Sequence, residues 1–390
     1  MKILYVAPCD SIHTKRWIER VSDRGIETLI VDITDQSKMH QIHNATIYRL
    51  RSENLHSKLN HIFFKLGFLG DFIKVLLLTI SYFNLINNLI KTERPDILHL
   101  HWLFHPAAFA SSFIREIPII STPWGSDLLI PEYNFTNNFF GKLKHKFTIK
   151  KVIRSSKAFC CDAQHMKNKL IEYGAKSDTI KIIYFGTDTE EFSPNNRDLS
   201  FWNAFNLKEN TIKVLSNRVL ASMYDIETLI RAAKIVDSQL KDIHFIISSD
   251  GPQGTSLRQY CEELEISKII TFTGRLNEID MRKSVASCDI YVSTSPTDGG
   301  IAASVAEAMS SAIPVVITDF GDNALWLKNQ SAGLLFPAND ENRLAEQIIS
   351  LAKDIKLRKT LGEQARKIIK SDNNLIYETE KVITMYDSLK

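Results

Sequence analysis

Residues 293–316 read STSPTDGGIAASVAEAMSSAIPVV. The segment follows a short apolar run, Ile290–Ser293, passes through a pair of glycines and then opens a stretch of small residues suited to a helix. The apolar residues 314–318 predict a second strand directly afterwards. A strand, a glycine turn, a helix and another strand in this order are typical of parallel sheets covered by helices.

The same alternation of short apolar runs and helix-length amphipathic stretches recurs along the whole chain. The expected strands are Ile3–Ala7, Thr28–Asp32, Ile97–Leu100, Ile119–Thr122, Ala158–Cys161 and Ile180–Tyr184, then Lys213–Asn217, His244–Ser248, Ile269–Phe272, Ile290–Ser293 and Pro314–Thr318. We therefore predict an α/β protein with two Rossmann-like domains, whose parallel sheets face a cleft between them.

The connection GTDTEEFSPNNRD at residues 186–198 is rich in polar residues and turn formers, so the domain boundary is expected near residues 186–200. We expect a first domain at 1–190, a second at 191–372, and a C-terminal helix at 373–390 that packs back toward the first.

Composition limits the protein class. With 390 residues, 44% hydrophobic and 24% charged, the chain resembles a soluble globular protein of two cores. Five scattered cysteines without CxxC spacing suggest neither a disulfide framework nor a zinc site, so no metal is expected. The start, MKILYVAPCD, lacks the pattern of a signal peptide, and a cytoplasmic location is expected.

Two features raise the question of a membrane. The apolar region 62–90 is interrupted by Lys65, Asp71 and Lys74, which argues against a helix that spans a membrane. The region is then expected to form either core helices or a helix that lies on a membrane surface. Residues 1–195 carry 25 Lys and Arg against 19 Asp and Glu, and seven of these bases lie in residues 142–157. That run is either a solvated helix face or a contact for an anionic or membrane-bound acceptor at the inner face of the membrane. The charge does not call for nucleic acid.

Ligands of open parallel sheets bind outside the carboxyl ends of the strands. The loops expected there are 8–16, 99–105 and 123–127 in the first half, and 218–225, 250–254, 274–276 and 296–307 in the second. In the last of these, Gly299 and Gly300 would let backbone amides approach a phosphate at a helix N-terminus, and Glu307 could accept hydrogen bonds from ribose hydroxyls. Tight helix packing is the alternative explanation for the glycines.

Several motifs together resemble glycosyltransferase family 4, a group of retaining GT-B enzymes, over nearly the whole chain. They are NRVLASMYDIETLIRA (217–232), IISSDGP (246–252), TFTGRL (271–276) and EAMSSAIPVVITDFGDN (307–323), with SIHTKRW (11–17) and TPWGSDLL (122–129) matching a subset of the family.

The resemblance implies a role for each matching position. Arg218 would pair with the diphosphate of a nucleotide diphosphate sugar, Glu307 would hold its ribose, and the backbone at Arg275 and Leu276 would meet the base. The implied donor-side residues also include Gly251, Gly274 and Ile301, and the implied catalytic residues are Asp298, Gly299, Gly300, Arg218, His13 and Asp127.

The chain departs from the family at two donor positions. Met223 stands where a lysine is usual and Gly299 where a glutamate is usual, and Asp298 takes the place of that carboxylate in a subset with a D-x-G-x-A-A-S pattern. Trp124 stands where many relatives have a histidine. His99, His101 and His105 lie near no carboxylate or cysteine that would complete a metal site, so a cleft-lining or packed role is expected.

The implied activity is hexosyl transfer of class EC 2.4, without metal or cofactor, from a nucleotide diphosphate sugar of unknown base. The acceptor would be a glycan, a lipid-linked molecule or another hydroxyl in cell-surface polysaccharide or glycoconjugate synthesis. A nucleotide-sugar epimerase of the same fold and a non-catalytic nucleotide-sugar-binding protein remain alternatives. A dehydrogenase is disfavoured because the loop after the first strand, APCDSIH, has no GxGxxG.

Overall fold

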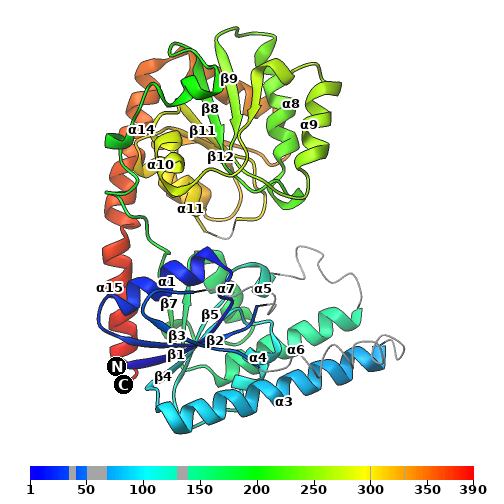
Figure 1. The fold of residues 1–390 in the computed structure, drawn as a ribbon, viewed down its shortest axis with the longest axis vertical. Coiled ribbons are helices and arrows are strands. Elements are labelled where there is room, and N and C mark those ends of the chain that lie inside the picture. Colours follow the sequence, from blue (N-terminus) through cyan, green and yellow to red (C-terminus); the bar gives the residue numbers. More distant parts are fainter. Residues whose placement is uncertain (35–40, 51–67, 130–138, 299, 329) are drawn as a thin grey trace. The chain divides into compact units, whose positions relative to one another are not determined.

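The computed structural model describes residues 1–34, 41–50, 68–129, 139–298, 300–328 and 330–390. The chain forms two compact units, which Figure 1 shows as separate groups of helices and strands. Unit 1 consists of Met1–Ile183 and Thr379–Lys390, and unit 2 of Tyr184–Glu378.

Unit 1 contains a parallel sheet in the order β3-β2-β1-β4-β5-β6-β7. Its strands are β1 (Lys2–Ala7), β2 (Glu27–Asp32), β3 (Ala45–Tyr48), β4 (Ile97–His101), β5 (Ile119–Thr122), β6 (Ala158–Cys161) and β7 (Ile180–Ile182). Its helices are α1 (Ile12–Ser22), α3 (Phe68–Glu93), α4 (Pro106–Ser111), α5 (Ser126–Leu129), α6 (Phe139–Ser155) and α7 (Gln164–Glu172), with the end of α15 (Leu375–Asp387).

Strand alternation divides the side chains of this sheet between two faces. Leu98 and Leu100 of β4 belong to a buried cluster with residues of α3, α4, α6 and α7. His99 and His101 lie on the other face, where Trp17 of α1 and Tyr386 of α15 pack against them. Helices therefore cover both faces of the sheet, as in Figure 1.

Unit 2 contains a second parallel sheet in the order β10-β9-β8-β11-β12-β13. Its strands are β8 (Ile212–Ser216), β9 (Ile243–Ile247), β10 (Ile270–Phe272), β11 (Ile290–Ser293), β12 (Val315–Thr318) and β13 (Gly333–Phe336). Its helices are α8 (Ile226–Asp237), α9 (Gly254–Glu263), α10 (Glu278–Ala286), α11 (Ala303–Ser310), α12 (Asn323–Trp326), α13 (Glu341–Lys353) and α14 (Ile355–Asp372). Apolar residues of α8 and α13 pack in one buried cluster with residues of the sheet, and those of α11 and α14 pack in another.

The predicted architecture of two parallel sheets with covering helices is confirmed. Two strands were not predicted, β3 and β13. The C-terminal helix α15 begins in unit 2 and ends in unit 1, where the Tyr386 hydroxyl lies 2.9 Å from that of Tyr5.

Helix α3 occupies much of the long apolar region. Over Phe72–Glu93 it is long and apolar enough to span a membrane by length and composition, and 22% of an apolar 18-residue window within it is buried. The residues that are buried, among them Tyr82, Ile86 and Leu89, pack in the core of unit 1. Because its inner face belongs to that core, we assign α3 to the folded unit.

Candidate functional site

Each sheet has one point at which the strand order reverses direction, and such points are where open α/β sheets bind ligands. In unit 2 the point lies between β8 and β11, which pair as neighbours. Arg218 comes shortly after β8, and Asp298 follows β11. The topology thus places the two residues at adjacent strand ends although 80 residues separate them.

Arg218 is the centre of a cluster of polar side chains. Its Nη2 lies 2.5 Å from Oδ1 of Asp298, and its Nη1 donates to Oγ of Ser304 at 3.2 Å. The guanidinium carbon lies 4.4 Å from the centre of the Tyr224 ring. Only 10% of the Arg218 side chain and 13% of the Asp298 side chain are exposed. The Nε of Arg218 is buried and has no hydrogen-bond partner among the described residues.

The Arg218 guanidinium is the positively charged group of this cluster. Burial lowers the pKa of Arg218, but Asp298 and the nearby phenols raise it further, so the net shift is upward and the guanidinium is fully charged. Burial also raises the pKa of Tyr291, which donates to Asn217 at 2.6 Å and therefore stays neutral. Ser304 lies in the first turn of α11, whose N-terminus adds a positive partial charge.

The other residues expected near the donor lie on the same helix and loop. Glu307, on the second turn of α11, is 8% exposed, and its carboxylate is close enough to affect the titration of Tyr291. Gly300 is buried. The side chain of Ile301 packs in the core of unit 2, so a contact with ligand would involve its backbone. Gly299 lies outside the described residues.

Two glycine turns complete this edge of the sheet. A side chain at Gly251 would collide with the backbone of Leu220, since an added Cβ would lie 2.4 Å from its carbonyl oxygen. The loops after β8 and β9 are therefore pressed together at this point. Gly274 has a φ of +71°, which favours glycine, and open space surrounds its Cα. It precedes an exposed Arg275 and a half-buried Leu276.

In unit 1 the reversal point lies between β1 and β4. His13 stands in the first turn of α1, where the Ser11 hydroxyl caps the helix, and its ring lies 5.9 Å from that of Trp124. Asp127 is fully buried, and its two carboxylate oxygens accept from the backbone N–H groups of Leu103 at 2.6 Å and Trp124 at 2.8 Å. Burial raises the pKa of Asp127 to about 6, against the lowering effect of these bonds. Asp127 thereby joins the loops that follow β4 and β5.

The histidines of β4 are packed side chains. The ring nitrogens of His99 bond to the hydroxyls of Tyr386 and Thr122, each at 2.7 Å. His101 is fully buried, and its ring nitrogens have no hydrogen-bond partner in the described part of the chain. Burial lowers the pKa of His101 to about 3, so it is neutral at physiological pH. His105 caps α4 by accepting from the backbone of Ala107.

Sequence reasoning did not assign Ser304, Tyr224 or Tyr291 to the site. Ser304 could have been found, because it is the final residue of the D-x-G-x-A-A-S pattern that begins at Asp298. Met223, at the usual lysine position, is 36% exposed, and its carbonyl accepts from the hydroxyl of Thr297. The site therefore has no lysine at this position.

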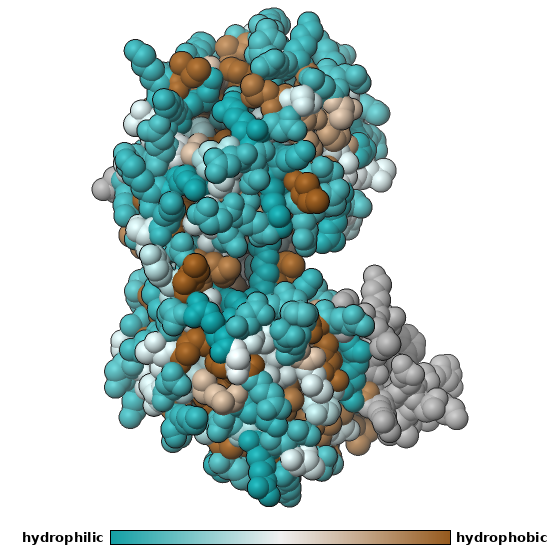
Figure 2. Space-filling model, turned by 60° about the vertical axis from the view of Figure 1, so that its left-hand side comes forward, coloured by the Kyte–Doolittle hydropathy of each residue, from teal (hydrophilic) through white to brown (hydrophobic). Residues whose placement is uncertain are grey.

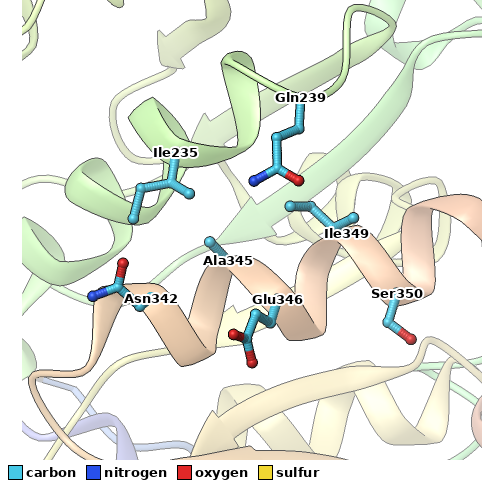
Figure 3. A pocket seen from close by; sticks show the side chains of 7 residues that line it. All are labelled: Ile235, Gln239, Asn342, Ala345, Glu346, Ile349 and Ser350. Atoms are coloured by element: carbon cyan, nitrogen blue, oxygen red, sulfur yellow. The ribbon is translucent and has the colours of Figure 1, made fainter.

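A cavity of about 380 Å³ lies elsewhere in unit 2, between α8 and α13. In Figure 3, Ile235 and Gln239 lie across from residues of α13 that include Ala345 and Ile349. Its only charged lining residue is Glu346, which would repel phosphate groups. The cavity therefore lacks the cationic chemistry found at Arg218.

Two family models match consecutive parts of the chain. Residues 12–191 match "Glycosyltransferase Family 4" and residues 200–368 match "Glycosyl transferases group 1". An uncharacterized glycosyltransferase of Methanocaldococcus jannaschii is 26% identical over 75% of this chain and 75% of its own length. An N-acetyl-alpha-D-glucosaminyl L-malate synthase of Bacillus anthracis is 22% identical over 77% of this chain and 75% of its own.

Among solved structures, Anabaena HepE in complex with UDP and glucose covers 100% of both chains with a TM-score of 0.74 and 18% identity. At that identity the likeness shows the fold. Matched models along both units, glycosyltransferase relatives and this fold lead to one conclusion: the chain is a glycosyltransferase of the GT-B type, related to family 4.

Proposed function

We propose that this glycosyltransferase moves a hexosyl group from a nucleotide diphosphate sugar to a hydroxyl of a glycan or lipid-linked acceptor, with retention at the anomeric carbon. The process served would be the synthesis of a cell-surface polysaccharide or glycoconjugate. In this proposal the donor binds at the carboxyl edge of the unit 2 sheet. Arg218 pairs with the diphosphate, Glu307 with the ribose hydroxyls, and the backbone at Arg275 and Leu276 with the base.

One observation carries the proposal, which is the environment of Arg218. A nine-tenths buried guanidinium requires anionic or polar partners, and Asp298 and Ser304 engage only its two terminal nitrogens. The buried Nε has no partner among the described residues. Diphosphate oxygens match the planar geometry of a guanidinium, and the adjacent N-terminus of α11 favours the same charge.

Asp298 has two successive roles in this proposal. Without donor, its carboxylate neutralises Arg218 across 2.5 Å. When diphosphate oxygens take over that guanidinium, the carboxylate becomes available to accept hydrogen bonds from hydroxyls of the transferred sugar. A carboxylate that accepts such bonds orients the sugar for reaction.

The proposed reaction needs no protein nucleophile. The acceptor oxygen forms a bond to the anomeric carbon while the bond from that carbon to the phosphate oxygen breaks, and a donor phosphate oxygen takes the acceptor proton. Negative charge builds up on the leaving phosphate, where Arg218 and the α11 N-terminus stabilise it. Because these groups supply the positive field, we expect activity without a metal ion.

We place the acceptor in unit 1, beside His13 and Trp124. The two rings lie 5.9 Å apart at the reversal point of the sheet, and aromatic faces suit the apolar faces of sugar rings. Both oxygens of Asp127 are already bonded to backbone N–H groups. We therefore propose that Asp127 positions Trp124 and the turn after β4.

Two of the related proteins support a nucleotide-sugar donor. The HepE structure contains UDP and glucose, and the Bacillus anthracis relative is named for its N-acetylglucosaminyl product. A panel of nucleotide sugars would identify the base and the sugar that this chain uses.

The test is incubation of the full chain with UDP-, GDP-, ADP- and dTDP-hexoses, with and without a mixture of lipid and glycan acceptors. We expect one nucleoside diphosphate to be released in an acceptor-dependent manner, with a retained anomeric configuration by NMR. Arg218→Ala should abolish release, and the exposed-residue control Arg343→Ala should not. Isomerised donor without acceptor would instead identify an epimerase, and nucleotide binding without any turnover would identify a binding protein.

A further inference from the structure

The outer surface of unit 1 carries a group of exposed apolar side chains on three neighbouring helices. Helix α4 packs against both α3 and α6, so the three form one layer over the same face of the sheet (Figure 1). We call the following residues the α3–α6 surface: Phe72, Leu76, Leu77 and Ile80 of α3, Phe113 after α4, and Leu143 and Phe147 of α6. Their exposures range from 36% to 63%.

The apolar character of α3 changes along a single stripe. Residues 72, 76, 80, 84 and 88 follow one another at a spacing of four, and all five are exposed. The first three are Phe72, Leu76 and Ile80, whereas the last two are Asn84 and Asn88. Packing against the sheet does not explain this difference, because all five side chains point away from it. The apolar half of the stripe is therefore the half suited to contact an apolar partner.

Helix α6 adds positive charge beside these apolar groups. Lys142, Lys144 and Lys146 are exposed and alternate with Leu143 and Phe147. No residue of α6 is acidic, and none is acidic between residues 72 and 92 of α3. Within the described part of the chain, no carboxylate forms an ion pair with these three lysines.

Aromatic contacts connect the helices of this layer. The ring of Phe109 in α4 lies 5.4 Å from that of Phe113 and 6.0 Å from that of Phe147, and the Lys151 ammonium lies 4.8 Å from the Phe113 ring centre. These contacts hold apolar side chains of α4 and α6 in one layer, with Lys151 of α6 against Phe113. Figure 2 shows one face of the protein, which is mostly hydrophilic and carries apolar side chains in small groups.

We propose that the α3–α6 surface docks unit 1 on a lipid bilayer that contains anionic headgroups. The apolar side chains of α3 would enter the boundary between headgroups and acyl chains, and the lysines of α6 would contact lipid phosphates. A second copy of this chain is a poorer occupant, because a symmetric contact would bring two lysine-bearing surfaces together and α6 has no acidic residue to pair with them. The inference rests on the proposed function in one respect: docking would bring the enzyme to a lipid-linked acceptor.

Vesicle flotation of the full chain tests this proposal. We expect binding to phosphatidylcholine vesicles with 30% phosphatidylglycerol, little binding to pure phosphatidylcholine, and a decrease when NaCl rises from 50 to 500 mM. Each lysine near an anionic surface strengthens binding by about fivefold. Loss of three lysines alone would weaken binding by about a hundredfold, so Lys142→Glu/Lys144→Glu/Lys146→Glu, which also adds repulsion, should weaken it by at least that factor. The matched control Lys356→Glu/Lys367→Glu/Lys370→Glu changes the net charge equally on exposed positions of α14 and should weaken it far less.

A second pair of variants isolates the apolar contribution. Leu76→Asn/Ile80→Asn continues the polar pattern of Asn84 and Asn88, so folding should be preserved while binding falls at least tenfold even at low salt. The control Ile279→Asn/Leu325→Asn alters two apolar residues of unit 2 that are even more exposed than Leu76 and Ile80, and it should bind like the wild type.

Three outcomes would overturn the proposal. The first is equal binding to neutral and anionic vesicles, and the second is wild-type vesicle binding by both α3 and α6 variants. The third is a dimer, by light scattering, that dissociates in Leu76→Asn/Ile80→Asn without any vesicle binding, since this would identify a self-association surface. The affinity for nucleoside diphosphate, measured in the same samples, tests the proposed function independently of vesicle binding. Loss of donor binding with intact vesicle binding would reject only the proposed function.

Discussion

Replacing Asp298 by asparagine is expected to move two measurements in opposite directions. Asp298 is the internal counter-ion of Arg218, and their atoms are 2.5 Å apart with side chains only 13% and 10% exposed. Without the carboxylate, the guanidinium is left buried and unneutralised, so unit 2 should become less stable. A diphosphate would then have no competing anion, so nucleoside diphosphates should bind more tightly.

The size of both effects follows from the geometry. Removing one member of a buried ion pair costs about 3–5 kcal/mol. Asparagine keeps an acceptor oxygen for Arg218, so we expect about 2–3 kcal/mol, or roughly 4–12 °C in the thermal transition of unit 2. A phosphate that shares the guanidinium about 5 Å from the carboxylate is repelled by about 3 kcal/mol at an effective dielectric constant of about 20. Partial rearrangement reduces this, and we expect at least a tenfold tightening, about 1.4 kcal/mol.

The assay is calorimetric titration of nucleoside diphosphate together with thermal unfolding, for wild type, Asp298→Asn, Arg218→Ala and the double variant. In the Arg218→Ala background, Asp298→Asn should cost little further stability, because the pair is already broken. Asp242→Asn, at an exposed position of unit 2, serves as the control. If Asp298→Asn leaves stability unchanged and weakens diphosphate binding as much as Arg218→Ala does, the counter-ion role is refuted.

Three further predictions concern single residues. Glu307→Gln should weaken the binding of a ribonucleoside diphosphate by about 1–3 kcal/mol, as measured by calorimetry. The binding of its 2′,3′-dideoxy analogue should be nearly unaffected. Met223→Lys restores the missing cation at a 36% exposed position, so it should tighten diphosphate binding by about 0.5–1 kcal/mol, and the gain should shrink in high salt. Burial raises the pKa of Asp127 to about 6, above its ordinary value of about 3.9. The folded state therefore binds this proton more tightly, and ionised Asp127 costs unit 1 about 1.4 kcal/mol per pH unit as pH rises from about 4 to about 6. In urea titrations across this pH range, the free energy of unfolding of Asp127→Asn should not show this decrease.

Each of these predictions has a contradicting result. Equal losses for the ribose and dideoxy ligands would remove Glu307 from ribose recognition. Weaker or unchanged binding in Met223→Lys would show that this position lies away from the diphosphate. The same pH dependence in Asp127→Asn as in the wild type would show that Asp127 titrates normally.

The alternation of apolar runs was sufficient to predict the two parallel sheets, but β3 and β13 were missed. Strand β3, Ala45–Tyr48, is only partly buried at the edge of its sheet, so its sequence lacks the continuous apolar run of an inner strand. Strand β13, Gly333–Phe336, begins with a glycine, which is also a common turn residue. The other two edge strands, β7 and β10, were predicted, so β3 and β13 were missed because of their own residues and not only because they lie at an edge.

At the candidate site, sequence patterns predicted individual residues but not their contacts. Arg218 and Asp298 were both expected there, yet their ion pair depends on β8 and β11 being neighbours, which no local pattern reveals. Tyr224 lay within the expected loop 218–225 but was given no role, because a tyrosine in a short turn has no distinguishing sequence context. The apolar run of α3 likewise did not indicate which of its residues would be buried, since Leu76 and Ile86 differ only in the face they occupy.

The central claim is that unit 2 binds the diphosphate of a nucleotide sugar through Arg218. Its most direct test is calorimetric titration of UDP, GDP, ADP and dTDP into wild type, Arg218→Ala and the exposed-residue control Arg343→Ala. We expect at least one nucleoside diphosphate to bind wild type and control equally, and to lose about 1.5–3 kcal/mol of affinity in a folded Arg218→Ala protein. The account is contradicted if no nucleoside diphosphate binds the wild type, or if Arg218→Ala binds it with unchanged affinity.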